Sequence, residues 1–78
     1  HALELANHGS YGLGSSVWSA NRGEEFSDKI RSGIGFVNAL PASDYSFPTG
    51  GVARSGFGRE CGSEGYRQFA NIKTHFVN

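Results

Sequence analysis

The residue best suited to covalent chemistry in this sequence is its one cysteine, Cys61. A catalytic thiol needs its pKa lowered by a base, a cation or a helix N-terminus. Arg59 and a helix expected to begin near Ser63 would supply part of that. Free cysteines are also commonly small buried hydrophobic residues, and neither His8 nor His75 has a carboxylate at a recognisable catalytic spacing. We therefore favour the structural interpretation of this thiol over the catalytic one.

A glycine-rich segment just before this cysteine is the second candidate for chemistry. Gly56-Phe57-Gly58 resembles part of a dinucleotide fingerprint, but no strand is expected immediately before it and Cys61 occupies the place of the third glycine. Four glycines between residues 50 and 58 require positive φ angles or close backbone approach. Arg59 and Glu60 would lock such a loop by hydrogen bonds to its carbonyls and amides. The sequence favours a supporting structural turn, with direct substrate contact as the alternative.

The composition excludes several classes of protein. The 78 residues hold seven basic and seven acidic side chains, so the chain lacks the surplus of lysine and arginine that nucleic-acid binding needs. No apolar run approaches the ~18 residues of a membrane span, and no Cys/His spacing predicts a zinc site or other metal ligands. A single cysteine cannot form an internal disulfide, which fits a reducing compartment and predicts a cytoplasmic protein. The sequence begins at His1 within an apolar-periodic stretch, as expected of a fragment.

The elements that must position these residues follow from hydrophobic periodicity and turn signals. Helices are predicted over residues 1–7, 21–31 and 63–70, and strands over 11–19, 34–37 and 72–77. Asn21 and Glu24 form a capping-box pattern at the start of the second helix, and Gly33 suits the position after its end. Residues 38–62 show no periodicity, and an irregular segment of that length is usually functional. The order of helices and strands predicts an α/β fold.

The glycine-rich segment also carries a resemblance to a known family. Residues 47–60, F-P-T-G-G-V-A-R-S-G-F-G-R-E, closely resemble the signature P-F-G-G-x-K-x-S-G-x-G-R-E of the aldehyde dehydrogenases. Three further segments are similar to family motifs in the same order: L-A-N followed by Y-G-L at residues 5–13, G-F-V-N at 35–38 and N-I-K-T at 71–74. The similarity covers nearly all of the chain, and it is greatest to succinate-semialdehyde dehydrogenase-type members.

This resemblance implies an NAD(P)-dependent enzyme that oxidises an aldehyde to a carboxylate. In the family a cysteine thiolate attacks the aldehyde, hydride passes to the nicotinamide, and a glutamate-activated water hydrolyses the thioester. The family motifs for these residues and for the cofactor are absent from the 78 residues, and Cys61 stands where the family usually has leucine. We therefore expect no catalytic residue here and no NAD or NADP bound by this chain alone, although the complete enzyme would use one of them.

The resemblance also divides the chain and assigns its loop. Residues 1–70 are similar to the end of the catalytic domain, and residues 71–78 to the C-terminal strand through which such enzymes form homo-oligomers. The segment from Asn38 to Gly51 is similar to the loop that lines the substrate tunnel. There Ser43 and Thr49 place hydroxyls where family members that act on apolar aldehydes often have aromatic side chains. This difference indicates a short polar aldehyde or semialdehyde as substrate, with a plain aliphatic or aromatic aldehyde as the alternative. The residues expected to shape the loop itself are Asn38, Gly50, Gly51, Ser55, Gly56, Gly58, Arg59 and Glu60.

The chain departs from the family pattern at one further position, and two alternative functions remain. Ala53 stands in place of the lysine of G-G-x-K, which leaves Arg54 as the nearest cation for a substrate carboxylate. The first rival is a non-catalytic truncated product that acts only as a self-association piece. A small binding module unrelated to the family is the second.

Overall fold

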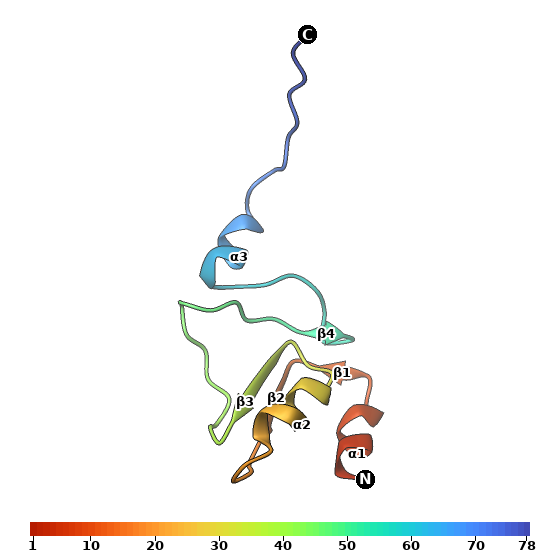
Figure 1. The fold of residues 1–78 in the computed structure, drawn as a ribbon. Helices are drawn as coiled ribbons and strands as arrows, with labels where there is room; N and C mark the ends of the chain where they lie inside the picture. The colour runs from red at the N-terminus through yellow and green to blue at the C-terminus, as the bar shows by residue number, and fades with distance from the viewer.

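Short helices and strands alternate along the chain. The computed structural model describes residues 1–78, the whole of the sequence. In chain order the elements are α1 (Ala2–His8), β1 (Tyr11–Gly12), β2 (Gly14–Val17), α2 (Gly23–Lys29), β3 (Ile34–Val37), β4 (Val52–Ala53) and α3 (Gly62–Arg67). The first two helices and the strands lie toward one end of the molecule, and the segment after α3 extends from the other (Figure 1). This order confirms the predicted α/β class, and none of the helices is long and apolar enough to span a membrane.

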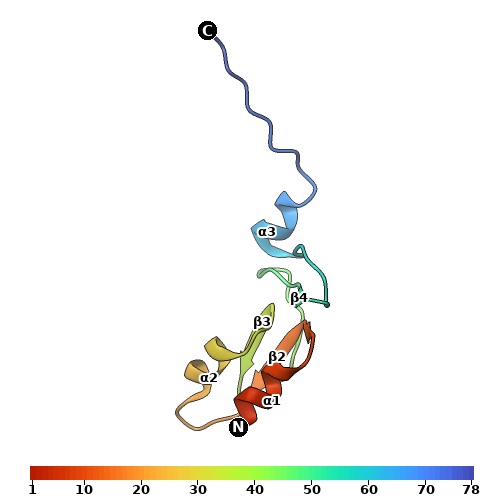
Figure 2. The ribbon, with the colours of Figure 1, turned by 90° about the vertical axis from the view of Figure 1, so that its right-hand side faces the viewer.

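The centre of the fold is a parallel strand pair with a helical crossover. β2 and β3 pair in parallel from Gly14↔Ile34 to Val17↔Val37, and α2, which connects them, packs against both strands. Figure 2 shows α1 and α2 beside this pair. The short apolar run at residues 34–37 predicts β3, and its bounds are confirmed.

The strand predicted over residues 11–19 is divided into two short strands with different partners. β1 pairs antiparallel with β4, placing Tyr11 opposite Ala53 and Gly12 opposite Val52, whereas β2 pairs with β3. The partner changes at Leu13, and β4 itself lies in the segment 38–62 for which no element is predicted. Pairing with residues far along the chain decides where these strands end, and local periodicity contains no information about it.

The second helix begins later and ends earlier than the sequence predicts. No side chain caps its N-terminus and Asn21 lies outside it, so the predicted capping box is wrong. Gly23 is buried because the first turn presses onto β3: a methyl group there would lie closer than 3.0 Å to Val37. The last helical residue is Lys29, and Ile30 after it already has an extended backbone. Gly33 is therefore not the glycine that ends the helix. Packing on β3 rather than local capping sets where this helix starts.

The last part of the chain differs most from its prediction. α3 spans Gly62–Arg67 rather than 63–70, and Cys61 is its N-cap residue. Residues 71–78 run extended and exposed with no backbone pairing, so no strand forms over 72–77 within this chain (Figures 1 and 2). The alternating side chains there suit a strand, but a strand also needs a neighbour to complete its hydrogen bonds.

Side-chain burial is low throughout the molecule. No hydrophobic side chain is buried, and Phe57 and Phe69 are almost fully exposed. The radius of gyration is 16.0 Å, against about 11.5 Å for a compact chain of this length. The chain therefore has no hydrophobic core of its own. Four of its 78 residues are buried, and all four are glycines: Gly12, Gly23, Gly51 and Gly65.

Candidate functional site

The glycine-rich loop of residues 49–60 is closed at its base by two backbone hydrogen bonds. Thr49 and Glu60 each donate an N–H to the other's carbonyl oxygen, both with an N···O distance of 2.7 Å. Inside the loop, Nη1 of Arg59 donates to the carbonyl oxygens of Gly51 at 3.0 Å and Gly58 at 2.7 Å. Glu60 acts here through its backbone, and its side chain is exposed. Arg59 and Glu60 thus hold the loop closed through its own carbonyls and amides.

The glycines of this loop meet the two conformational demands inferred from the sequence. Gly56 and Gly58 have φ angles of 108° and 86°, which residues with a side chain rarely adopt. Gly50 and Gly51 allow close approach instead. A methyl group on Gly50 would collide with the Gly58 carbonyl, and one on Gly51 would lie 2.6 Å from the Cβ of Ser55. The absence of side chains lets the loop fold back on itself.

The two predicted substrate-binding residues, Ser43 and Thr49, line one open pocket of about 460 Å³. Its apolar lining includes Leu13, Ile34 and Phe36. The Oγ1 of Thr49 is buried and has no hydrogen-bond partner, whereas Ser43 is exposed. A buried hydroxyl without a partner carries a desolvation cost. Thr49 lines the pocket as a residue, but its oxygen is covered by the chain, so a polar group in the pocket would reach it only after the Thr49 side chain turns.

Ser55 and Arg54 connect the loop to β1 rather than to the pocket. The Oγ of Ser55 accepts a hydrogen bond from the backbone N–H of Gly12 at 2.9 Å. The backbone N–H of Arg54 donates to the carbonyl of Ser10 at 2.9 Å. The Arg54 guanidinium lies over the ring of Tyr11, 5.4 Å from its centroid. Arg54 does not line the pocket of Ser43 and Thr49, so its position does not support the expected role toward a substrate carboxylate.

Asn38 fixes the point at which the long loop leaves the sheet. Its φ of 53° lies in the left-handed region, where asparagine is enriched. Its Nδ2 donates to the Ser19 carbonyl and its Oδ1 accepts from the Ser19 N–H, both at 2.9 Å. The Oγ of Ser16 adds a hydrogen bond to the Ala39 carbonyl at 2.6 Å. The start of the segment 38–51 is therefore tied to β2 and to the residues that follow it.

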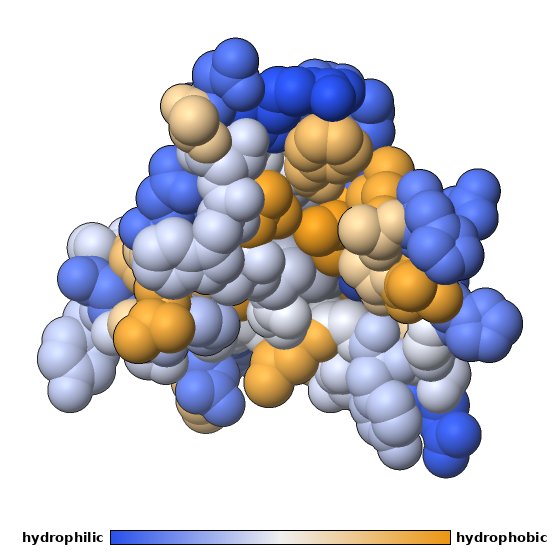
Figure 3. Space-filling model, turned by 90° about the horizontal axis from the view of Figure 1, so that it is seen from below, coloured by the Kyte–Doolittle hydropathy of each residue, from blue (hydrophilic) through white to orange (hydrophobic).

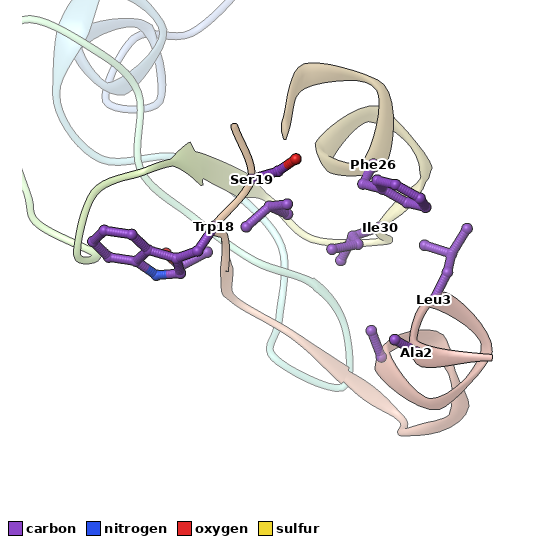
Figure 4. A pocket seen from close by; sticks show the side chains of 9 residues that line it. Ala2, Leu3, Trp18, Ser19, Phe26 and Ile30 are labelled. Atoms are coloured by element: carbon purple, nitrogen blue, oxygen red, sulfur yellow. The ribbon is translucent and has the colours of Figure 1, made fainter. Parts of the chain in front are cut away.

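A second, apolar pocket of about 410 Å³ lies between α1, β2 and α2, where the sequence predicts no site. Figure 4 shows Leu3, Phe26 and Ile30 facing a common space, with the ring of Trp18 to one side. Figure 3, seen from below, shows apolar side chains gathered around a hollow on the surface. Two serines are the only polar residues in the lining of this pocket. It therefore offers a contact surface but no titratable group for catalysis.

The carboxyl groups with shifted pKa values line neither of these two pockets. Hydrogen bonds from Arg22 and then Lys29 lower the pKa of Glu25 to about 2. Hydrogen bonds from the side chain and backbone of Ser46 lower the pKa of Asp44. All of these residues are exposed, and no group of three or more His, Cys, Asp or Glu side chains could hold a metal ion. These shifts belong to surface contacts, and they do not mark an acid–base site.

Cys61 has no histidine beside it. It is half-buried at the N-cap of α3 with a φ of 64°. The pocket next to it is lined by residues that include Tyr45, Glu60 and Tyr66 but no histidine. His8 and His75 are both exposed. No histidine of this chain therefore lies in position to activate the thiol.

The residues of the glycine-rich loop do not fit a nicotinamide dinucleotide. Such a site needs a parallel strand, a glycine turn and the N-terminus of a helix in direct succession. Here Gly56 follows the two-residue antiparallel strand β4, and α3 begins only at Gly62. Arg59 is already bonded to two loop carbonyls. The glycines of this loop instead form a tight turn.

Comparison with known proteins decides the family. The sequence model of the aldehyde dehydrogenase family matches residues 1–75. The chain belongs to the aldehyde dehydrogenase family. Succinate-semialdehyde dehydrogenase [NADP(+)] from Mycobacterium leprae is 44% identical over 78 residues, which cover 97% of this chain and 17% of that protein. A probable succinate-semialdehyde dehydrogenase [NADP(+)] from Synechocystis is 41% identical over the same shares of the two chains.

Solved aldehyde dehydrogenases share the fold of this chain. The NAD⁺ complex of aldehyde dehydrogenase from Bacillus cereus is 34% identical with a TM-score of 0.93, covering 99% of this chain and 16% of its own. Succinic semialdehyde dehydrogenase from Streptococcus pyogenes in complex with NADP⁺ is 35% identical with a TM-score of 0.89, covering 97% and 17%. This aldehyde dehydrogenase chain thus spans about one sixth of the length of the relatives it matches.

Sequence analysis missed one residue that ties together distant segments of this aldehyde dehydrogenase chain. The side chain of Asn7 joins α1 to the segment after α2: its Nδ2 donates to the Lys29 carbonyl at 2.8 Å, and its Oδ1 accepts from the Arg31 N–H at 2.7 Å. The sequence signal available for Asn7 was its place in the L-A-N motif. The partners lie more than twenty residues away in the sequence, so the motif alone does not reveal them.

Proposed function

We propose that this chain is part of an NAD(P)-dependent aldehyde dehydrogenase that oxidises a polar semialdehyde to a carboxylate, and that it forms one wall of the substrate tunnel. The observation that carries the proposal is the buried, unpaired Oγ1 of Thr49 in a pocket shared with Ser43. Relatives named succinate-semialdehyde dehydrogenase, 41–44% identical to this chain, support the same substrate class.

The lining of the pocket explains how such a substrate would be selected. Leu13, Ile34 and Phe36 offer apolar contact to the carbon chain of the aldehyde. The hydroxyls of Ser43 and Thr49 donate hydrogen bonds to the polar group at its far end. A site built to bond a polar group rejects an analogue without it, because the protein's own group is then left unpaired. Within this chain, selection rests on hydrogen bonds rather than on a cation, since Arg54 is turned toward Tyr11.

The cofactor belongs to other parts of the complete enzyme. NAD or NADP supplies the hydride acceptor there, as the names of the relatives indicate. The glycine-rich loop of this chain does not fit that group, and its part is to shape the pocket and exclude water from it. The free cysteine is consistent with a reducing, cytoplasmic location.

Residues 71–78 form the association strand of the enzyme, and residues 1–70 belong to its catalytic domain. The terminal segment supports this division because it is extended and has no backbone pairing. Its side chains Ile72, Phe76 and Val77 are 96%, 88% and 87% exposed. An unpaired apolar strand of this kind pairs readily with another chain. Homo-oligomers would form through it.

A chimeric enzyme tests the substrate proposal. In this chimera, residues 1–78 replace the matching part of the Mycobacterium leprae succinate-semialdehyde dehydrogenase. We expect kcat/KM to favour succinate semialdehyde over hexanal and benzaldehyde. Thr49→Val, which removes the hydroxyl, should lower kcat/KM for the semialdehyde alone. Thr49→Phe should shift preference toward the two apolar aldehydes by ~1–3 kcal/mol, the scale of small pocket changes.

The control for these variants is Ser63→Ala, which removes an exposed hydroxyl in α3 and should leave the preference unchanged. A chimera that prefers benzaldehyde, or a Thr49→Phe variant with unaltered preference, would refute the proposal. A chimera that assembles into oligomers without any turnover would favour the rival function, a non-catalytic self-association piece. That rival draws its support from the unpaired segment 71–78.

A further inference from the structure

The short segment between α2 and β3 supports the loop that carries Thr49. We call residues 31–33 the support segment. A methyl group on Gly33 would collide with the carbonyl oxygen of Gly50, far inside the 3.0 Å that real Cβ atoms keep, and would lie 3.0 Å from the Cα of Gly51. Gly50 is the residue next to Thr49. The position of the Thr49 hydroxyl therefore depends on there being no side chain at residue 33.

The support segment is itself held by hydrogen bonds from two other elements. The backbone N–H of Gly33 donates to the Gly12 carbonyl at 3.1 Å. The hydroxyls of Ser32 and Ser15 share a hydrogen bond of 2.8 Å, which ties the segment to β2. These bonds resist movement of the segment when a larger residue is placed in it. Because the atoms nearest to an added methyl group are backbone atoms of Gly50 and Gly51, volume at residue 33 pushes on the loop backbone.

A third connection comes from the other side of the molecule. The Oδ1 of Asn7 accepts from the N–H of Arg31, and Nη2 of Arg31 donates to the Gly9 carbonyl, both at 2.7 Å. The end of α1 is thereby fastened to the first residue of the support segment. Loss of the Asn7 side chain would loosen the segment without adding any volume to it.

We propose that Gly33 is a positioning residue that sets the substrate selectivity of the Ser43 and Thr49 pocket, with Asn7 holding it in place. This inference rests on the proposed function, because it concerns the same pocket. Gly33 touches no substrate and acts by fixing the backbone that carries Thr49. A displacement of about 1 Å in a substrate-binding group can cost about 100-fold in rate, and it affects most the substrate that uses that group.

The test compares two glycine-to-alanine substitutions in the chimera. Gly33→Ala should reduce the ratio of kcat/KM for succinate semialdehyde to that for hexanal by about 10-fold to 100-fold, chiefly through a higher KM for the semialdehyde. Gly9→Ala is the matched control: it keeps the Gly9 carbonyl that Arg31 bonds, the φ of −71° suits alanine, and a methyl group there meets nothing within 4 Å. Its ratio should stay unchanged. A substitution that only destabilised the fold would lower activity toward both aldehydes by the same factor.

A second variant keeps the test decisive if Gly33→Ala does not fold. Asn7→Ala should change the ratio in the same direction by a smaller factor. An unchanged ratio in Asn7→Ala, or an equal loss for both aldehydes in Gly33→Ala, would overturn the inference. If Thr49→Val leaves the ratio unchanged while Gly33→Ala and Asn7→Ala alter it, the proposed role of the Thr49 hydroxyl fails and the positioning role stands.

Discussion

Replacing Arg59 by methionine should open the glycine-rich loop. Methionine keeps the apolar stem but removes both hydrogen bonds from Nη1, to Gly51 at 3.0 Å and to Gly58 at 2.7 Å. Hydrogen bonds from a charged group contribute about 1.5–3 kcal/mol each. Taking the lower value for both gives a loss of about 3 kcal/mol, which corresponds to a roughly 150-fold larger population of the open loop.

Hydrogen exchange of the chimera measures this opening directly. The N–H groups of Thr49 and Glu60 are bonded to each other's carbonyls in the closed loop, so peptides that contain them should exchange about 100-fold faster in Arg59→Met. Arg67→Met is the matched control, since Arg67 makes only an exposed 3.3 Å ion pair with Glu64 and should change exchange by less than about 5-fold. Equal exchange at the loop in both variants would refute the role of Arg59.

Three further predictions follow from the same structure. The isolated chain should associate through its exposed segment 71–78, and sedimentation as a cooperatively folded monomer would contradict this. With NAD or NADP and an aldehyde, the isolated chain should form no reduced nucleotide. In the chimera, Cys61→Ala should leave the aldehyde dehydrogenase activity in place. A chimera that folds but is inactivated by this change would show that the thiol is catalytic. Glu25 should titrate near pH 2 and, in Arg22→Gln, closer to its ordinary value of 4.5, as followed by carboxyl NMR. Because its pKa is lower in the folded state, its stabilising effect is complete above about pH 4.5 and is lost as the pH falls toward 2.

Local patterns predicted those elements whose cause lies within a few residues. Ile34–Val37 is a short apolar run between turns, and its strand bounds follow from that alone. The predicted start of α2 was wrong, because contact between Gly23 and Val37 overrides the capping pattern at Asn21. The prediction of a single strand over 11–19 was wrong, because the pairing partner changes from β4 to β3 at Leu13. Both errors concern contacts between residues that are distant in sequence.

In the candidate site too, the features set by local sequence could be predicted and those set by distant contacts could not. The glycine content of residues 50–58 indicates a tight turn, and φ angles of 108° and 86° at Gly56 and Gly58 agree with it. Ser43 and Thr49 were chosen through family resemblance, and they line one pocket. The burial of the Thr49 Oγ1 and the collision of any side chain at residue 33 with Gly50 depend on three-dimensional packing. No spacing in the sequence encodes them.

The four buried glycines reverse the meaning of an alanine scan in this chain. Alanine usually truncates a side chain, but at these positions it adds the first carbon of one. At Gly12 that carbon would lie 2.6 Å from the carbonyl oxygen of Arg31, and at Gly65 it would lie 2.6 Å from the carbonyl carbon of Glu60. Many large apolar residues, among them Tyr45, Phe57 and Phe69, are exposed and can be shortened with little effect inside this chain. The buried glycines should therefore tolerate alanine less well than these exposed aromatic residues do, opposite to the trend in a protein with a packed core.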